Sequence, residues 1–229
     1  MPSCRVLCFD LDDTLWPCRP TILAAEAGLY DWLRRTAPRL TARWDIEGLR
    51  EHRRAVAREM PAIAHDLTLL RRRSLEQLLE KFGYDPGLSG EGMALFRRLR
   101  NRVEPYPEVA RVLRALRGRH LLIALTNGNV EMQHTPLAGC FDLSLTAADV
   151  GEAKPHPALF EAALAWAGAT PAQAVHLGDD PQTDVMAARA AGLQAVWMNR
   201  AGRRWPGPDA GPVEVADLGA FRAWLRRRR

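Results

Sequence analysis

The chain lacks closely spaced cysteines. Its four cysteines are Cys4, Cys8, Cys18 and Cys140, and none forms a CxxC pair. A zinc site or a redox dithiol is therefore not expected. Cys4 and Cys8 fall on one face of the first predicted strand, where we expect buried free thiols.

The chain also lacks long apolar runs. None approaches the roughly 18 residues that a membrane-spanning helix needs. Asp10, Asp12 and Asp13 interrupt the apolar segment near the N-terminus, so no secretory signal is expected. We therefore expect a cytoplasmic protein with no membrane partner.

Lysine is nearly missing. Of the 32 basic residues only Lys81 and Lys154 are lysines, and the formal net charge is +5. The arginines are spread along several predicted helices, so we expect no nucleic-acid partner. The closing residues, Arg226 to Arg229, are expected to form a solvated tail.

What remains is typical of a globular protein, with 47% hydrophobic and 26% charged residues among 229. Short apolar segments bounded by turn residues predict strands. Helical patterns separate most of them, which predicts an α/β fold with a parallel sheet covered on both faces. The predicted strands are Arg5–Phe9, Leu121–Thr126, Leu143–Thr146, Ala174–Leu177 and Gln194–Met198.

Helices are expected in two groups. Those that alternate with strands are Pro107–Leu116, Pro157–Ala167 and Thr183–Ala191. From about Cys18 to Arg102 the alternation breaks, and no strand is predicted. That stretch contains the helical patterns Thr21–Arg35, Ile46–Glu59, Asp66–Phe82 and Gly90–Arg102, which predict a helical cap inserted after the first strand.

Acidic residues follow the first predicted strand, within Phe9–Thr14. Asp10 and Asp12 alternate, so both side chains point to the same side of the sheet. Two carboxylates held this close repel each other unless a divalent cation shares their charge, and oxygen ligands suit magnesium. For this hexapeptide alone, a solvated loop is the alternative.

Three more polar motifs lie at or near later strand ends, where ligands gather in an open parallel sheet. Taken alone, Thr126–Asn129 predicts a turn and Lys154 a surface lysine. Asp179, Asp180 and Asp184 alone would cap the following helix. Occurring together in this order, the four motifs favour a catalytic site.

The motifs together suit phosphoryl transfer. A phosphate monoester is a dianion, and magnesium would remove its repulsion from a carboxylate. Asp10 would be the nucleophile, forming an aspartyl phosphate, and Asp12 the general acid and base. Thr126 and the N–H groups from Asn127 onward would hold the transferring oxygens, while Lys154 supplies positive charge.

The metal site would draw on the same acids. Either Asp179 or Asp180 would complete it, with Asp184 in support. The candidate magnesium ligands are therefore Asp10, Asp12, Asp179, Asp180 and Asp184.

The four motifs resemble those of the haloacid dehalogenase superfamily of hydrolases. The matching residues are Asp10, Asp12 and Thr14 for DxDxT, then Thr126, then Lys154, then Gly178, Asp179 and Asp184 for GDxxxxD. The resemblance spans essentially the whole chain. It implies a Rossmann-like, doubly wound core from residues 1–17 and 103–229, a helical cap from 18–102, and magnesium-dependent hydrolysis of phosphoric monoesters. It favours Asp179 over Asp180 as the metal ligand.

A closer resemblance lies in the cap, carried by Arg19–Leu23 and by His65–Thr68 with Arg71 and Arg73. These segments resemble the bacterial branch that dephosphorylates flavin mononucleotide and 5-amino-6-(5-phospho-D-ribitylamino)uracil. The resemblance implies a small phosphorylated metabolite as partner and a place in riboflavin biosynthesis. His65, Arg71 and Arg73 are candidates to face the substrate. For the two arginines the alternative is that they are solvated helix residues.

Two other functions stay open. A haloacid dehalogenase uses the same fold and an aspartate nucleophile but needs neither a metal nor an acid at the position of Asp12. A non-catalytic binding protein would be expected to have lost one of the motif residues, and none is missing. The sequence leaves both a monomer and a homodimer possible.

Overall fold

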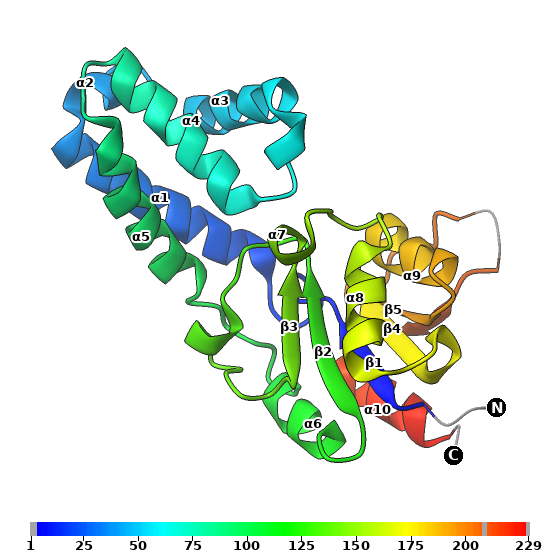
Figure 1. The fold of residues 1–229 in the computed structure, drawn as a ribbon. Helices are drawn as coiled ribbons and strands as arrows, with labels where there is room; N and C mark the ends of the chain where they lie inside the picture. The colour runs from blue at the N-terminus through cyan, green and yellow to red at the C-terminus, as the bar shows by residue number, and fades with distance from the viewer. Residues whose placement is uncertain (1–3, 208–209, 228–229) are drawn as a thin grey trace. The chain divides into compact units, whose positions relative to one another are not determined.

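The structure is a computed structural model, and it describes residues 4–207 and 210–227. The chain forms two compact units (Figure 1). The α/β unit consists of Met1–Pro17, Glu104–Gly128 and Pro136–Arg229, and the helical unit of Cys18–Val103 and Asn129–Thr135.

A six-stranded parallel sheet forms the centre of the α/β unit, in the order β3-β2-β1-β4-β5-β6. This confirms the predicted α/β class, with the first strand between the second and the fourth. The sequence analysis did not predict β6, which is a short, mostly exposed edge strand. The strands are β1 Val6–Phe9, β2 Leu121–Thr126, β3 Leu143–Thr146, β4 Ala174–Gly178, β5 Gln194–Met198 and β6 Val213–Val215.

Helices cover both faces of the sheet. Neighbouring residues of β1 point to opposite faces, so each face packs against a different set of helices. Val6 and Cys8 pack into a buried cluster with residues of α8 (Ala158–Ala167) and α9 (Ala187–Ala190). Phe9 points the other way and meets Phe221 of α10 (Leu218–Arg226) edge to face, with ring centroids 5.9 Å apart. α6 (Val109–Leu116) packs against α10.

Some predictions about the α/β unit need correction. The predicted helix Thr183–Ala191 is a π-helix, η5 (Pro181–Met186), followed by the short α9. Cys8 is buried as predicted, but Cys4 is only partly buried, and none of the four cysteines forms a disulfide. Arg226 ends α10 rather than starting a tail, and the last two arginines of the predicted tail lie outside the described residues. The short helices α7 (Ala147–Val150) and η4 (Pro171–Gln173) complete this unit.

The helical unit is built around a long pair of helices, α1 and α5, which pack along each other. α4 packs against both α3 and α5, and apolar residues from α1, α4 and α5 form a shared buried core. The elements are α1 Cys18–Thr36, α2 Pro38–Thr41, α3 Ile46–Glu59, η1 Pro61–Ile63, α4 Leu67–Lys81, η2 Pro86–Leu88, α5 Ser89–Arg100 and η3 Met132–His134.

Local signals explain where these helices begin. The Asp45 carboxylate accepts a hydrogen bond from Gly48 N at the start of α3. Asp66 accepts two, from Thr68 N and Leu69 N, at the start of α4. Such side chains satisfy backbone N–H groups that have no partner inside the helix.

The segment Asn129–Thr135 belongs to the helical unit, although the sequence analysis placed it in the core. Paired hydrogen bonds hold it there: Glu131 N donates to Asn101 Oδ1, and Asn101 Nδ2 donates to Glu131 Oε2. Among the described residues, no helix is long and apolar enough to span a bilayer.

Candidate active site

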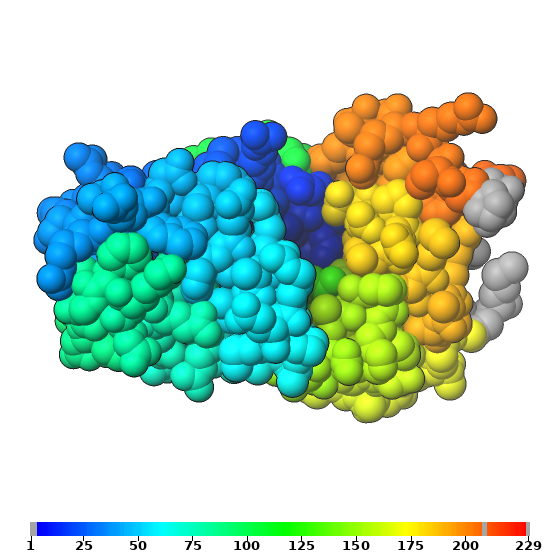
Figure 2. Space-filling model, turned by 90° about the horizontal axis from the view of Figure 1, so that it is seen from above, coloured from blue at the N-terminus to red at the C-terminus, as the bar shows by residue number. Residues whose placement is uncertain are grey.

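A pocket of about 130 Å³ lies where β1, β2 and β4 of the α/β unit end. Seen from above the view of Figure 1, dark-blue atoms from near the N-terminus lie in a recess beside the yellow segment (Figure 2). All four motifs contribute to the lining, which consists of Asp10, Asp12, Thr126, Asn127, Gly128, Lys154, Asp179, Asp180, Thr183 and Asp184.

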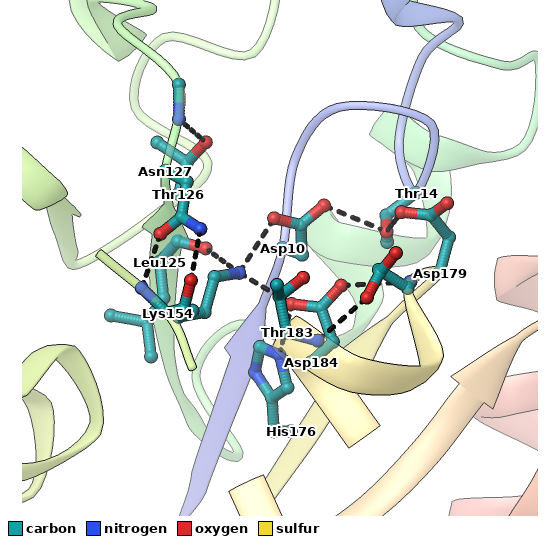
Figure 3. A network of polar contacts seen from close by, with 12 residues as sticks. Asp10, Thr14, Leu125, Thr126, Asn127, Lys154, His176, Asp179, Thr183 and Asp184 are labelled. Atoms are coloured by element: carbon teal, nitrogen blue, oxygen red, sulfur yellow. Dashed lines mark hydrogen bonds and ion pairs between the residues drawn. The ribbon is translucent and has the colours of Figure 1, made fainter. Parts of the chain in front are cut away.

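Lys154 is the centre of the polar network (Figure 3). Its side chain is buried, and Nζ donates to Asp10 Oδ1 at 2.9 Å, to Leu125 O at 3.0 Å and to Asp184 Oδ1 at 2.6 Å. Burial alone would lower the lysine pKa, but the carboxylates of Asp10 and Asp184 outweigh it and raise that pKa. Lys154 is therefore a fixed ammonium whose three protons all have acceptors.

Asp184 reaches this ammonium because of two local features. The π-helix turns its carboxylate back over Gly178, where a Cβ atom would lie only 2.3 Å from Asp184 Cγ, so no side chain fits at that glycine. The carboxylate also accepts hydrogen bonds from His176 Nε2 at 3.1 Å and from Asp180 N at 3.1 Å. Burial raises the pKa of Asp184, but Lys154 and His176 outweigh it and lower that pKa overall.

Asp10 and Asp179 complete a cluster of three acids with Asp184. One ligand oxygen from each carboxylate lies within 4.8 Å of the other two. Burial and the charge of Asp184 raise the pKa of Asp10. Burial and the same charge raise the pKa of Asp179 to about 7. Both acids are therefore harder to ionise than an exposed aspartate.

These residues fit a divalent metal. Lys154 serves two of the three carboxylates, and the exposed Arg203 lies 3.7 Å from the third, Asp179, so the cluster still has excess negative charge when all three are ionised. Hard oxygen donors suit magnesium, whose charge would favour the ionised acids. Asp10, Asp179 and Asp184 are the residues that would hold it.

The other two candidate ligands have carboxylates bound elsewhere. Asp12 Oδ1 accepts a hydrogen bond from Trp16 Nε1 at 2.8 Å, although Asp12 still lines the pocket. Asp180 Oδ1 accepts from Gln182 N and Thr183 N and caps the π-helix. Of the adjacent acids, the structure thus groups Asp179, rather than Asp180, with Asp10 and Asp184.

The turn after Asp10 is fixed by the next residues of the hexapeptide. Asp13 adopts a left-handed backbone conformation with φ of 59°, which aspartate tolerates better than most residues. Thr14 Oγ1 lies 3.1 Å from Asp10 Oδ2 and 3.4 Å from Asp179 Oδ1. Thr14 therefore links two of the three clustered acids.

Asn127 lines the pocket, and its side chain has a partner that the sequence analysis did not predict. Its side-chain oxygen accepts from Lys154 N at 2.7 Å, and its Nδ2 donates to Lys154 O at 2.8 Å. Asn127 thus anchors the lysine backbone. Thr126 is buried and lines the pocket, with Oγ1 accepting from Gly128 N at 2.9 Å.

The three cap candidates lie in the helical unit and differ among themselves. His65 is partly buried in the turn before α4. Arg71 is mostly buried, with its guanidinium 3.8 Å above the ring of Phe96. Arg73 is exposed and donates to Glu76 Oε2 at 2.9 Å. The structure does not gather them into one cluster.

Sequence reasoning assigned no role to His176. It is fully buried in β4, Phe160 packs against its ring edge to face, and its Nε2 bonds the Asp184 carboxylate. The signal that could have revealed it was a lone histidine, just before the Gly178-Asp179 motif, on a strand otherwise made of apolar residues and glycine.

Known proteins resemble this chain over most of its length. The phosphatase YigB of Escherichia coli (strain K12), named for 5-amino-6-(5-phospho-D-ribitylamino)uracil, is 34% identical over 200 residues, 84% of this chain and 82% of that protein. A phosphoserine phosphatase of Thermus thermophilus is 36% identical over 211 residues, 87% of this chain and 80% of that protein.

A solved structure is more similar still. The 2-haloacid dehalogenase of Pseudomonas syringae pv. Tomato DC3000 has a TM-score of 0.93 and 38% identity, covering 98% of this chain and 99% of that one. A family model for haloacid dehalogenase-like hydrolases matches residues 4–192. With its four motifs gathered at the strand ends, the chain belongs to the haloacid dehalogenase-like hydrolase family.

Proposed function

We propose that this hydrolase is a magnesium-dependent phosphatase of small phosphomonoesters. The observation that carries the proposal is the cluster of Asp10, Asp179 and Asp184 beside the buried Lys154. Three acids and one fixed cation suit a metal and a phosphoryl group together.

Asp10 is the proposed nucleophile. Its carboxylate attacks phosphorus, the bond to the leaving oxygen breaks, and an aspartyl phosphate forms. Lys154 and Thr14 hold the carboxylate by one oxygen each, which fixes its direction before attack. Magnesium would supply charge that offsets the repulsion between the phosphate dianion and these acids.

Asp12 is the proposed acid and base. It protonates the leaving oxygen, then takes a proton from the water that attacks the phosphorus of the aspartyl phosphate. Inorganic phosphate leaves and Asp10 is restored. The indole N–H of Trp16 holds one oxygen of Asp12, which orients the carboxyl at the pocket wall.

The proposed substrates follow from the relatives. Similarity to YigB favours 5-amino-6-(5-phospho-D-ribitylamino)uracil. The resemblance of the cap segments adds flavin mononucleotide, and both substrates suit a step in riboflavin biosynthesis. Similarity to the Thermus enzyme adds phosphoserine to the panel. Phosphate release with magnesium, compared as kcat/KM across these compounds, identifies the preferred substrate.

Asp10→Asn tests the nucleophile. We expect phosphate release to fall at least about a thousandfold, because removing a nucleophile removes the covalent path. Asp13→Asn is the matched control, since it removes a neighbouring charge and asparagine accepts the same left-handed backbone. Full activity of Asp10→Asn with magnesium would contradict the proposal.

Asp12→Asn tests the acid. The loss should be larger for an alkyl phosphate than for p-nitrophenyl phosphate, whose leaving group needs little protonation. An equal loss on both substrates would argue that Asp12 acts only by shaping the site.

A dehalogenase is the second candidate, favoured by the similarity to the Pseudomonas structure. In that reaction the carboxylate of Asp10 would attack carbon and displace halide. Halide release from a 2-haloacid in the presence of a chelator, without phosphatase activity, would establish it in place of the first proposal.

A further inference from the structure

The helical unit contains a second buried charge cluster, which the proposed reaction does not use. Glu26 on α1 is buried and lies among three arginines. Its Oε2 is 2.6 Å from Arg50 NH2, and its Oε1 is 3.3 Å from Arg53 NH2 and 3.5 Å from Arg71 NH1. One carboxylate therefore serves three guanidinium groups.

The arginines are unequally compensated. Arg50 has a second partner, Glu47, at 2.8 Å. For Arg53 and Arg71, Glu26 is the one carboxylate recorded within ion-pair distance among the described residues, and both contacts are long. Arg71 Nε is buried, and no described residue accepts a hydrogen bond from it. Leaving such a buried donor without a hydrogen bond costs about 1–3 kcal/mol.

The same groups line a pocket. Glu26, Arg50, Arg53 and Arg71 share its wall with Ser74 and with aliphatic side chains of α1, α3 and α4, including Leu29, Leu49 and Leu78. The internal space is about 30 Å³. A water needs about 10–15 Å³ on this measure, so a group of a few atoms fits.

Electrostatics favours a negative occupant. Burial and the charge of Arg53 lower the pKa of Arg71 to about 9. Burial also lowers the pKa of Arg53. An anion beside both would reduce their mutual repulsion, and the planar fork of a guanidinium matches a carboxylate better than a spherical ion.

We propose that this pocket binds a small carboxylate anion, held by Arg53 and Arg71 beside Glu26, with its short alkyl part against the leucines. Every group that forms this pocket lies in the helical unit, and none of them takes part in the proposed phosphatase chemistry. Its test therefore needs no substrate and no metal.

Acetate is the probe, used on the full chain without added divalent metal. In saturation-transfer NMR the acetate methyl signal should respond in the wild type and in Arg72→Gln, but not in Arg71→Gln or Arg53→Gln. Arg72 is the matched control because it lies on the same helix, is exposed and pairs with Glu76. Arg53→Gln decides the question if Arg71→Gln does not fold.

Thermal unfolding gives a second readout. Acetate should raise the wild-type Tm along a saturating curve, because a ligand that binds only the folded state stabilises it. Chloride should act more weakly at equal concentration. Equal effects of both salts on the wild type and Arg71→Gln would overturn the site, and equal effects on the wild type alone would overturn the carboxylate preference.

Glu26→Gln separates a binding site from a simple ion-pair network. Removal of the competing carboxylate should tighten acetate binding at least severalfold in folded protein. Unchanged or weaker binding in a variant with native circular dichroism would overturn the proposal.

Discussion

The two units of this protein bury opposite arrangements of charge. In the α/β unit a single ammonium, Lys154, lies between the carboxylates of Asp10 and Asp184. In the helical unit a single carboxylate, Glu26, lies among arginines. Each cluster contains a single ion of one sign and several ions of the opposite sign.

The difference lies in how the excess is held. The aspartates of the α/β unit are fixed by backbone at strand ends and by a π-helix, so their repulsion cannot relax. The arginines have long, flexible side chains, and Arg50 and Arg53 keep 24% and 22% of their side-chain surface exposed. Short, fixed acids suit a tightly held cation, whereas the arginines suit a weakly held anion.

Lys154→Met should produce the largest effect. It leaves two buried carboxylates without their cation, so we expect a loss of about 3–5 kcal/mol in unfolding free energy. Urea denaturation measures it, and added magnesium should restore part of the loss if the acids bind it. Lys81→Met, at the only other lysine, is the control and should cost about 1 kcal/mol or less. Similar losses of unfolding free energy in both variants would show that Lys154 stabilises the fold no more than Lys81 does.

Glu26→Gln should cost less, about 2 kcal/mol at pH 7, because Arg50 and Arg53 keep part of their side chains in water. Glu47→Gln, at an exposed ion pair, is the matched control and should cost under about 1 kcal/mol.

The Glu26 contribution should depend on pH. Burial opposes ionisation, but Arg50, Arg71 and Arg53 outweigh it and hold the pKa of Glu26 below its ordinary value of 4.5. The stabilisation is therefore complete above about pH 4.5 and is lost as the pH falls through the lower, folded-state pKa. The difference between wild type and Glu26→Gln should shrink in acid, and a difference that grows there would contradict the assignment.

His176→Leu should act on the metal rather than on the fold. Asp184 loses one of its donors, and the affinity for magnesium should fall about tenfold, measured by calorimetry. His120→Leu, whose ring contacts Cys4 O at 3.1 Å, is the control. Equal magnesium affinities in both variants would assign His176 a packing role only.

Asp66→Ala should have the smallest effect. It removes the cap of α4, the helix that carries Arg71, at a cost of about 1 kcal/mol. Acetate binding should weaken little in the folded variant. A loss as large as that of Arg71→Gln would show that helix position, and not the guanidinium, controls the pocket.

The sequence predicted β1 to β5 because each is a short apolar segment bounded by turn residues. It did not predict β6, whose three residues are too few and too exposed to show a pattern. It predicted one continuous helix over Thr183–Ala191, where the structure has a π-helix followed by α9. Local periodicity does not distinguish a π-helix from an α-helix.

The side-chain partners were harder to predict. Asn127 lies in a segment that predicts a turn. Only the fold shows that its side-chain amide forms hydrogen bonds with the backbone of Lys154. Arg71 has the sequence signature of an exposed helix residue or a ligand contact, yet it is buried against Phe96 and Glu26. These contacts join residues far apart in the chain, which spacing alone cannot relate.

Periodicity and motif order are local properties of the chain, so the fold class, the family and the acids at the strand ends could be predicted from the sequence. The folded chain was needed to show that Asp179 joins Asp10 and Asp184 while Asp180 caps a helix. It also showed that Glu26 meets three arginines from α3 and α4. Adjacent acids look alike in sequence, and their different roles come from the backbone directions that the folded chain imposes.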